Sequence, residues 1–455
     1  MELIKKRTEI IRNGNDKGSF VAYWTSNTLR VNNNYSLKIA SEIALDKNLP
    51  LKIFFYHNES HYKCIDRHTI VLLNGLIELA DELNHFGHEL EFVNCINDLE
   101  ILNLIECHTI IIDKTYTKRS FDYTLEILRN YNANIVSIDN LYLPANLISN
   151  KQEYSAATFR RKYYKVTNSL IDLTFDISRE LTRVKKIKSS ENTKEKILKR
   201  LASLKDEFIE TVNLGKNGAY ASKENLNIFL NENLTNYEEN SSKPEFEYVS
   251  KLSKDLHYGF ISPAYIIKKL ILRKLDFSSS FVEQLLIRRE LTFNYTLNNK
   301  NYNNINGLPV WALKTLNEHG KDEREYAYRL SDFENGQTHD EYWNAAQNEM
   351  LRSGYMHGYM RMYWGKKILE WSNNFKDAHN ITLKLNNKYQ LDGRSPSGYV
   401  GVSWCYGLHD RGWKEREIFG KIRYMNMNGL DRKFDMARYV DRVRNLWNMK
   451  KYMIN

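Results

Sequence analysis

The chain has 455 residues and a mass of 53.9 kDa, enough for two to four domains at about 100–200 residues each. Hydrophobic residues make up 42% and charged residues 27%, which excludes a disordered or fibrous chain. Lys and Arg number 66 against 56 Asp and Glu, a net charge of +10, and aromatic residues reach 13%. A basic, aromatic-rich protein favours an anionic partner, nucleic acid first.

The sequence predicts an intracellular protein, cytoplasmic or nuclear, that is not secreted. Its start lacks the apolar core of a signal peptide, and no stretch approaches the ~18 apolar residues of a membrane helix. The cysteines form no C-x-x-C pair, so neither a disulfide framework nor a metal site is expected. We expect a monomer without membrane contact. The cysteines are Cys64, Cys95, Cys107 and Cys405.

The first 140 residues alternate between short apolar runs and longer segments with helical spacing. This alternation predicts βαβ units and a Rossmann-like parallel sheet of five strands covered on both faces. No G-x-G-x-x-G fingerprint is present, so the sheet alone does not identify a ligand. The expected strands are Val21–Trp24, Leu51–Tyr56, Leu90–Val93, Thr109–Ile112 and Asn134–Ile138, and the expected helices include Tyr35–Asp46, Thr69–Asn84 and Phe121–Tyr131.

The composition changes after Asp176. Residues 177–205 are rich in Lys, Arg, Ser and Glu, which indicates a charged connector. From 206 onward helical spacing dominates, for example over Phe281–Leu291, His339–Arg352 and Tyr359–Asn373. We therefore predict an α/β domain over 1–176, the connector, and a larger all-α domain over 206–455.

Positive charge is concentrated near the C-terminus. The stretch Arg411–Asn455 holds twelve Lys or Arg against five Asp or Glu, a local net charge of +7. Solvated helical faces would account for it, and so would a patch that contacts phosphates. The local concentration favours the phosphate-contacting patch.

Three of the eight tryptophans lie close together in the sequence. The segment Tyr355–Trp371 predicts one helix with Trp364 and Trp371 two turns apart on one face, and Trp343 on the helix before it. An aromatic stripe at this spacing is usually core. A line of tryptophans can also carry electrons to a buried redox cofactor, but the spacing alone favours the core.

Several long sequence segments together resemble those of the class II cyclobutane pyrimidine dimer photolyases. The resemblance runs through nearly the whole chain in the same order. It implies an α/β domain followed by a helical domain that binds FAD, in agreement with the division above. The segments are Tyr23–Trp24, Leu252–Gly259, Gly336–Gln347, Met356–Trp364, Lys366–Trp371, Leu385–Arg394 and Phe419–Met425.

The resemblance implies light-dependent repair of cyclobutane pyrimidine dimers in ultraviolet-damaged double-stranded DNA. In this family, photoexcited reduced FAD passes an electron to a dimer that has been flipped out of the duplex. Relatives differ in whether a second, antenna chromophore occupies the α/β domain, and no ligand motif here identifies one.

The family pattern places four residues around the flavin ring. Asn386 matches the asparagine that faces flavin N5, where an amide can either donate or accept a hydrogen bond. Asp392 and Arg394 match flavin-proximal positions. Arg361 matches an arginine near the ring that could pair with Asp392, and a cation there would favour the reduced, anionic flavin.

A hydroxyl-bearing turn matches the family's contact with the FAD phosphates. Its residues are Ser250, Leu252 and Ser253. Relatives continue with Pro and an aromatic residue, whereas this chain has Lys254 and Asp255.

The tryptophans match the family's electron-transfer chain, in the order Trp364, Trp343, Trp371 from flavin to surface. Trp404 matches a tryptophan that lines the dimer pocket, where its ring could stack on an extruded base. Arg411, Arg288 and Met362 are the other expected contacts on the DNA side.

Gln284 is the most informative departure, because relatives carry a glutamate whose carboxyl group contacts the dimer. Gln284 can donate a hydrogen bond but cannot supply a proton. We therefore expect repair with a lower quantum yield. The substitution also gives weight to a cryptochrome-like photoreceptor with weak or no repair. A non-catalytic DNA-binding protein is a third alternative, which the retained tryptophans and Asn386 disfavour.

Overall fold

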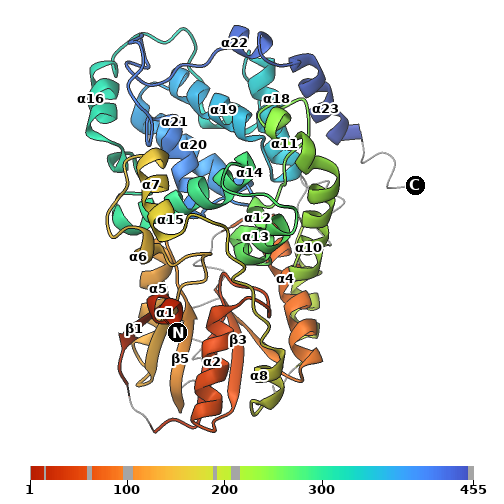
Figure 1. Ribbon diagram of the computed structural model, residues 1–455. Helices are drawn as coiled ribbons and strands as arrows, with labels where there is room; N and C mark the ends of the chain where they lie inside the picture. The colour runs from red at the N-terminus through yellow and green to blue at the C-terminus, as the bar shows by residue number, and fades with distance from the viewer. Residues whose placement is uncertain are drawn as a thin grey trace.

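The computed structural model describes residues 2–14, 17–58, 64–95, 106–187, 192–205 and 216–448. An α/β domain lies in the lower part of Figure 1 and a larger helical domain lies above it. Parts of three sequence predictions fall outside the described residues: 188–191 of the connector, 206–215 at the start of the helical domain, and 449–455 of the basic C-terminal stretch. No helix within the described ranges is long and apolar enough to cross a membrane.

The α/β fold is confirmed, but the sheet has six strands in the described residues rather than five, in the order β1-β6-β5-β2-β3-β4. The additional strand, β1 (Thr8–Arg12), pairs antiparallel with β6, with Thr8 opposite Ile138. The prediction missed it because an edge strand is partly solvated and lacks a long apolar run; Ile10 is 64% exposed. The parallel strands are β2 (Phe20–Trp24), β3 (Leu51–Asn58), β4 (Leu90–Cys95), β5 (Cys107–Asp113) and β6 (Asn134–Ile138).

Helices cover both faces of the sheet, because successive side chains of a strand point to opposite sides. Val21 and Tyr23 of β2 belong to a core shared with the helices of one face, whereas Ala22 and Trp24 pack with Leu128 of the other face. The first face carries α2 (Tyr35–Asp46), α4 (Asp66–His85), α8 (Ser178–Arg183) and α9 (Thr193–Leu201), and the second carries α5 (Lys118–Leu128).

In its described residues the helical domain contains α-helices and, unexpectedly, two π-helical segments, η1 (Phe229–Asn233) and η2 (Glu283–Arg288). The predicted helix over Tyr355–Trp371 is shorter, because the His357 side chain caps the helix by accepting from the N–H of Tyr359. The other helices of the domain are α10 (Ala219–Ile228), α11 (Leu234–Asn240), α12 (Ser253–Tyr258), α13 (Pro263–Ile271), α14 (Ser280–Val282), α15 (Arg289–Asn298), η3 (Ile305–Gly307), α16 (Val310–Glu318), α17 (Leu330–Glu334), α18 (Glu341–Ser353), α19 (Gly358–Glu370), α20 (Phe375–Tyr389), α21 (Pro396–Cys405), α22 (Met427–Asp431) and α23 (Met436–Asn448); α1 (Glu2–Arg7), α6 (Ala145–Ile148) and α7 (Ala156–Val166) come earlier in the chain.

A fully buried arginine of α4, Arg67, joins the two domains. Its guanidinium donates to the backbone carbonyls of Met350 (3.3 Å), Leu351 (3.0 Å) and Tyr389 (3.3 Å). These carbonyls lie at the C-terminal ends of α18 and α20, where a cation is favourable because the helix dipole is negative there.

A second junction brings the backbones of the two domains into close contact. The guanidinium of Arg30 donates to the carbonyl of Gly259 at 2.7 Å. Gly259 has a φ of +72°, and a Cβ at this position would lie 2.0 Å from the carbonyl oxygen of Asn27. Only glycine fits both the left-handed backbone and this approach.

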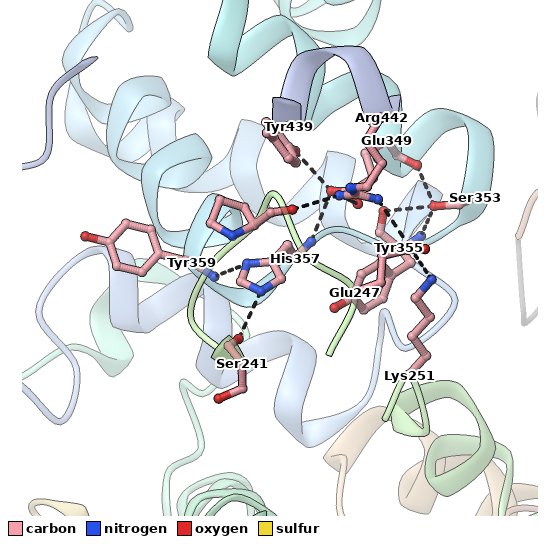
Figure 2. A network of polar contacts seen from close by, with 11 residues as sticks. Ser241, Glu247, Lys251, Glu349, Ser353, Tyr355, His357, Tyr359, Tyr439 and Arg442 are labelled. Atoms are coloured by element: carbon pink, nitrogen blue, oxygen red, sulfur yellow. Dashed lines mark hydrogen bonds and ion pairs between the residues drawn. The ribbon is translucent and has the colours of Figure 1, made fainter. Parts of the chain in front are cut away.

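The last helix, α23, is fixed by a buried ion pair (Figure 2). The carboxylate of Glu349, 1% exposed, accepts from Arg442 Nη2 at 2.6 Å, from the hydroxyl of Tyr439 at 3.0 Å and from the N–H of His357 at 3.2 Å. Arg442 also pairs with Glu247 at 3.3 Å. The C-terminal helix is thereby tied to α18 and to the segment that precedes Ser250.

We predict that Arg442→Met destabilises the protein by about 3–5 kcal/mol, because it leaves the buried Glu349 carboxylate without its cation. The measurement is the free energy of unfolding from urea titrations. Arg444→Met is the matched control: its ion pair with Glu341 is exposed, so a loss of no more than about 1 kcal/mol is expected. Adding Glu349→Gln to Arg442→Met should recover most of the stability; an unchanged midpoint for Arg442→Met would contradict the assignment.

Candidate functional site

A cavity of about 450 Å³ lies between the two domains. One wall consists of residues near the carboxyl ends of β2, β3 and β5 and the start of α5. The opposite wall comes from Tyr237 and from three longer parts of the helical domain: 250–263, 281–293 and 392–399. Carboxyl ends of parallel strands and domain interfaces are common ligand sites.

Six residues predicted from the sequence line this cavity together. They are far apart in the chain, but the fold places them around one volume. They are Ser250, Leu252, Ser253, Gln284, Asp392 and Arg394.

Cations dominate the charged lining of the cavity, which favours an anionic ligand. Burial lowers the pKa of Arg30 to about 10, so this guanidinium stays charged at neutral pH. Burial also lowers the pKa of His257 to about 4, so this imidazole is neutral there. The lining cations are Arg30, Lys114, Arg119, Arg289 and Arg394, and the lining carboxylate is Asp392.

Three residues of the turn at 250–253 line the cavity. Leu252 is 2% exposed, and its N–H donates to Ser250 Oγ at 3.4 Å. The two residues that depart from the family pattern do not line the cavity. Instead the ammonium of Lys254 pairs with the buried carboxylate of Asp255 at 2.7 Å, and this carboxylate also accepts from the Ser222 hydroxyl at 2.9 Å.

Asn386 lies one layer behind the cavity wall, near the end of α20. Its Nδ2 donates to Asn387 Oδ1 at 3.1 Å, and the N–H of Arg394 donates to the same oxygen at 2.9 Å. The Oδ1 of Asn386 is buried and has no hydrogen-bond partner among the described residues. This oxygen can therefore accept a hydrogen bond from a ligand N–H.

Arg361 forms an ion pair with Asp392, the partner that the family resemblance suggests for it. Arg361 Nη2 lies 3.3 Å from Asp392 Oδ1 and 3.1 Å from the side-chain oxygen of Gln390. The lining residues therefore fit FAD, because the lining cations suit its diphosphate.

The tryptophans form a continuous row of buried rings. Trp364 and Trp343 are stacked with centroids 6.3 Å apart at 11°, and Trp343 contacts Trp371 at 6.1 Å and 65°. The geometric order is therefore Trp364, Trp343, Trp371. The far end differs from the expectation, because Trp371 is only 3% exposed and is covered by His339 (4.9 Å) and Tyr328 (5.7 Å).

The residues expected to contact DNA do not all lie together in the structure. The guanidinium of Arg288 lies 5.2 Å from the centroid of the Trp404 ring, so these two form one cluster. Met362 Sδ lies 4.0 Å from Sγ of Cys405, the neighbour of Trp404. Arg411 is exposed and lies over the ring of Trp413 at 5.4 Å.

Sequence reasoning missed Arg289, Arg119 and Lys114, which line the cavity, and Trp413, whose ring contacts two guanidinium groups. The guanidinium carbon of Arg423, like that of Arg411, lies near the Trp413 ring, 5.1 Å from its centroid. The adjacent pair of arginines at the end of η2 was the available signal for Arg289.

Within the described ranges, no group of three His, Cys, Asp or Glu is placed to hold a metal ion.

Known proteins similar in sequence carry one name. A deoxyribodipyrimidine photo-lyase of Methanothermobacter thermautotrophicus is 36% identical over 434 residues, which cover 94% of this chain and 96% of the relative. Enzymes of the same name from Potorous tridactylus (33% identical; 94% and 82% covered) and Oryza sativa (34%; 98% and 92%) also align. No protein-family model matches the chain.

Solved structures share the fold at low sequence identity. A class III photolyase from Agrobacterium tumefaciens superposes with a TM-score of 0.68 at 17% identity, covering 94% of this chain and 86% of that one. A Sulfolobus tokodaii photolyase gives 0.69 at 15% identity, with 93% and 90% covered. A Synechocystis cryptochrome gives 0.68 at 16%, with 94% and 89% covered. Because the chain is 33–36% identical to these relatives and covers 82–96% of their length, it belongs to the deoxyribodipyrimidine photo-lyase family.

Proposed function

We propose that this protein is a class II photolyase that uses FAD and light to repair cyclobutane pyrimidine dimers in ultraviolet-damaged double-stranded DNA. The observation that carries the proposal is the row of three buried tryptophan rings in contact, because a purely DNA-binding protein needs no such row. The names of the relatives support the repair reaction. The sequence segments that resemble class II photolyases support the assignment to class II.

When bound, reduced FAD supplies the electron that opens the dimer. Ser250 and Ser253 would hold its phosphates. On the family pattern, Asn386, whose Oδ1 has no partner among the described residues, would accept from a ring N–H. Arg361 and Arg394 add positive charge that favours the anionic, reduced ring.

On the DNA side, Trp404 would stack on a base that has left the duplex, which contributes about 1–3 kcal/mol in single-strand complexes. Arg411 and the basic residues around it would contact the phosphates of the opened strands. These contacts hold and orient the dimer while the stack around it is open.

We also propose that the part of the cavity lined by Trp24, Phe55 and His57 can hold a second chromophore at the strand ends. Support comes from the Sulfolobus tokodaii relative of similar fold, whose structure is described as containing two FAD molecules.

The test of the proposed function is a blue-light repair assay on DNA that contains dimers, with a dark control. Loss of dimers only in the light is expected. The second candidate is a flavin photoreceptor without repair, which Gln284 favours. It predicts visible flavin absorbance in the purified protein and no loss of dimers, so the same assay separates the two.

We predict that Gln284→Glu raises the repair yield per photon several-fold, because the carboxyl group restores a proton and a second acceptor next to the dimer. The yield is measured at saturating dimer-containing DNA under blue light. Glu283→Gln is the control: Glu283 binds Arg160 and Arg288 rather than facing the cavity, so its change should not raise the yield. A yield unchanged by Gln284→Glu would defeat this account of the substitution.

We predict that Trp343→Phe abolishes light-driven reduction of oxidised flavin while leaving the flavin bound. Phe keeps most of the packing between Trp364 and Trp371 but is far harder to oxidise, so the row is interrupted in the middle. Visible absorbance during illumination with an external thiol donor measures the effect. Chemically reduced Trp343→Phe protein should still repair dimers; normal photoreduction in the variant would show that electrons take another route.

A further inference from the structure

The indole N–H groups of the two inner tryptophans donate to oxygens that are not bases. Trp364 Nε1 donates to the side-chain oxygen of Gln347 at 2.9 Å, and Trp343 Nε1 donates to the backbone carbonyl of Trp364 at 3.0 Å. None of these three residues is more than 1% exposed. Each inner indole N–H therefore has a neutral acceptor and is shielded from solvent.

The amide of Gln347 is held in one orientation. Its Nε2 donates to the backbone carbonyl of Glu334 at 3.0 Å, so its oxygen faces the indole of Trp364. The reversed amide would set donor against donor and acceptor against acceptor, which is unfavourable where all the groups are buried. The negative end of the amide dipole is thereby fixed on the indole N–H.

Nearby carboxylates are engaged by other groups. Glu334 Oε1 accepts from Lys388 Nζ at 2.6 Å. Asp340 accepts from the backbone N–H of Trp343 at 2.9 Å and from the hydroxyl of Tyr363. In the part of the chain that the structure describes, neither inner indole N–H donates to a carboxylate or an imidazole.

We propose that Gln347 keeps the proton on Trp364 when this ring has lost an electron, so that the positive charge passes on to Trp343 instead of being trapped. This inference rests on the proposed function, in which light moves an electron from Trp364 to oxidised flavin. Loss of one electron makes the indole N–H acidic, and a base at hydrogen-bond distance would take the proton.

An amide oxygen is not protonated near neutral pH, so the oxidised ring stays a cation. The fixed amide dipole stabilises that cation, and Trp343 can then reduce it. One electron moves inward at each step, and no proton leaves either inner ring.

The experiment uses the flavin-loaded Trp343→Phe protein, in which the row is interrupted and the positive charge stays on Trp364 after a blue flash. Transient absorbance separates a tryptophan radical cation from the neutral radical that remains when the N–H proton is lost. With Gln347 in place, we expect the cation throughout the neutral pH range, decaying at the same rate in H2O and D2O. A neutral radical in this protein would overturn the proposal.

Two further variants in the same background place a base at position 347. Gln347→Glu and Gln347→His keep a hydrogen-bond acceptor, but a carboxylate or a neutral imidazole can bind the released proton. The neutral radical should appear in a fraction that rises with pH, because the new group must first be deprotonated, and its decay should be slower in D2O. A cation in both variants at alkaline pH would overturn the role of Gln347.

Asn348→Asp is the matched control, because it adds a carboxyl group to the same helix at a side chain that bonds to the carbonyl of Asn344. It should leave the cation unchanged. A neutral radical in this control would overturn the proposal in favour of a general effect of added charge.

A second readout needs neither light nor electron transfer. In the dark, Gln347→Met should shift the indole N–H proton resonance of Trp364 upfield, because its hydrogen bond is lost; an unshifted resonance would overturn the proposal. Purified wild-type protein without flavin absorbance would refute the proposed function itself, before any flash is given.

Discussion

The geometry of the site depends on one buried guanidinium, that of Arg67, which crosses from the sheet domain into the helical domain. An arginine without partners costs several kcal/mol when buried, and here the partners are carbonyls at the ends of two helices. The relative position of α4, α18 and α20 is therefore fixed by directional hydrogen bonds as well as by apolar packing. This junction, together with that of Arg30, holds the cavity walls of both domains at their spacing.

The charge of the chain is distributed unevenly between interior, cavity and surface. Inside the protein, buried carboxylates such as Glu349 and Asp255 have a cation in contact. Glu290, next to the cavity residue Arg289, shows the alternative: burial raises the pKa of its carboxyl group to about 8, so it is mostly neutral at neutral pH. The surplus of positive charge is left for the cavity lining and for the exposed stretch that contains Arg411.

The sequence anticipated features that arise from local patterns and missed those that arise from contacts between distant residues. The buried parallel strands and α2 were predicted correctly because their apolar runs and spacing are local. Strand β1 was missed because its half-exposed side chains carry little signal, and η2 because nothing in its composition distinguishes a π-turn from an α-turn. The resemblance anticipated six of the cavity residues, whereas the three carbonyl partners of Arg67 lie 283, 284 and 322 positions away and leave no local trace in the sequence. Roles such as that of Gln284 follow from the family pattern and remain predictions.

The position of the cavity between the domains links occupancy to cooperativity. A ligand that touches both walls stabilises only the docked arrangement, by about 2.7 kcal/mol when its concentration is a hundred times the dissociation constant. In the loaded protein the sheet domain and the helical domain then unfold as one unit. In the empty protein the same two domains are held by the Arg67 and Arg30 junctions, by other hydrogen bonds such as that between His68 Nε2 and the carbonyl of Lys388 at 3.0 Å, and by apolar contacts. A bound ligand adds its own contacts to this set and so contributes to the stability of the fold.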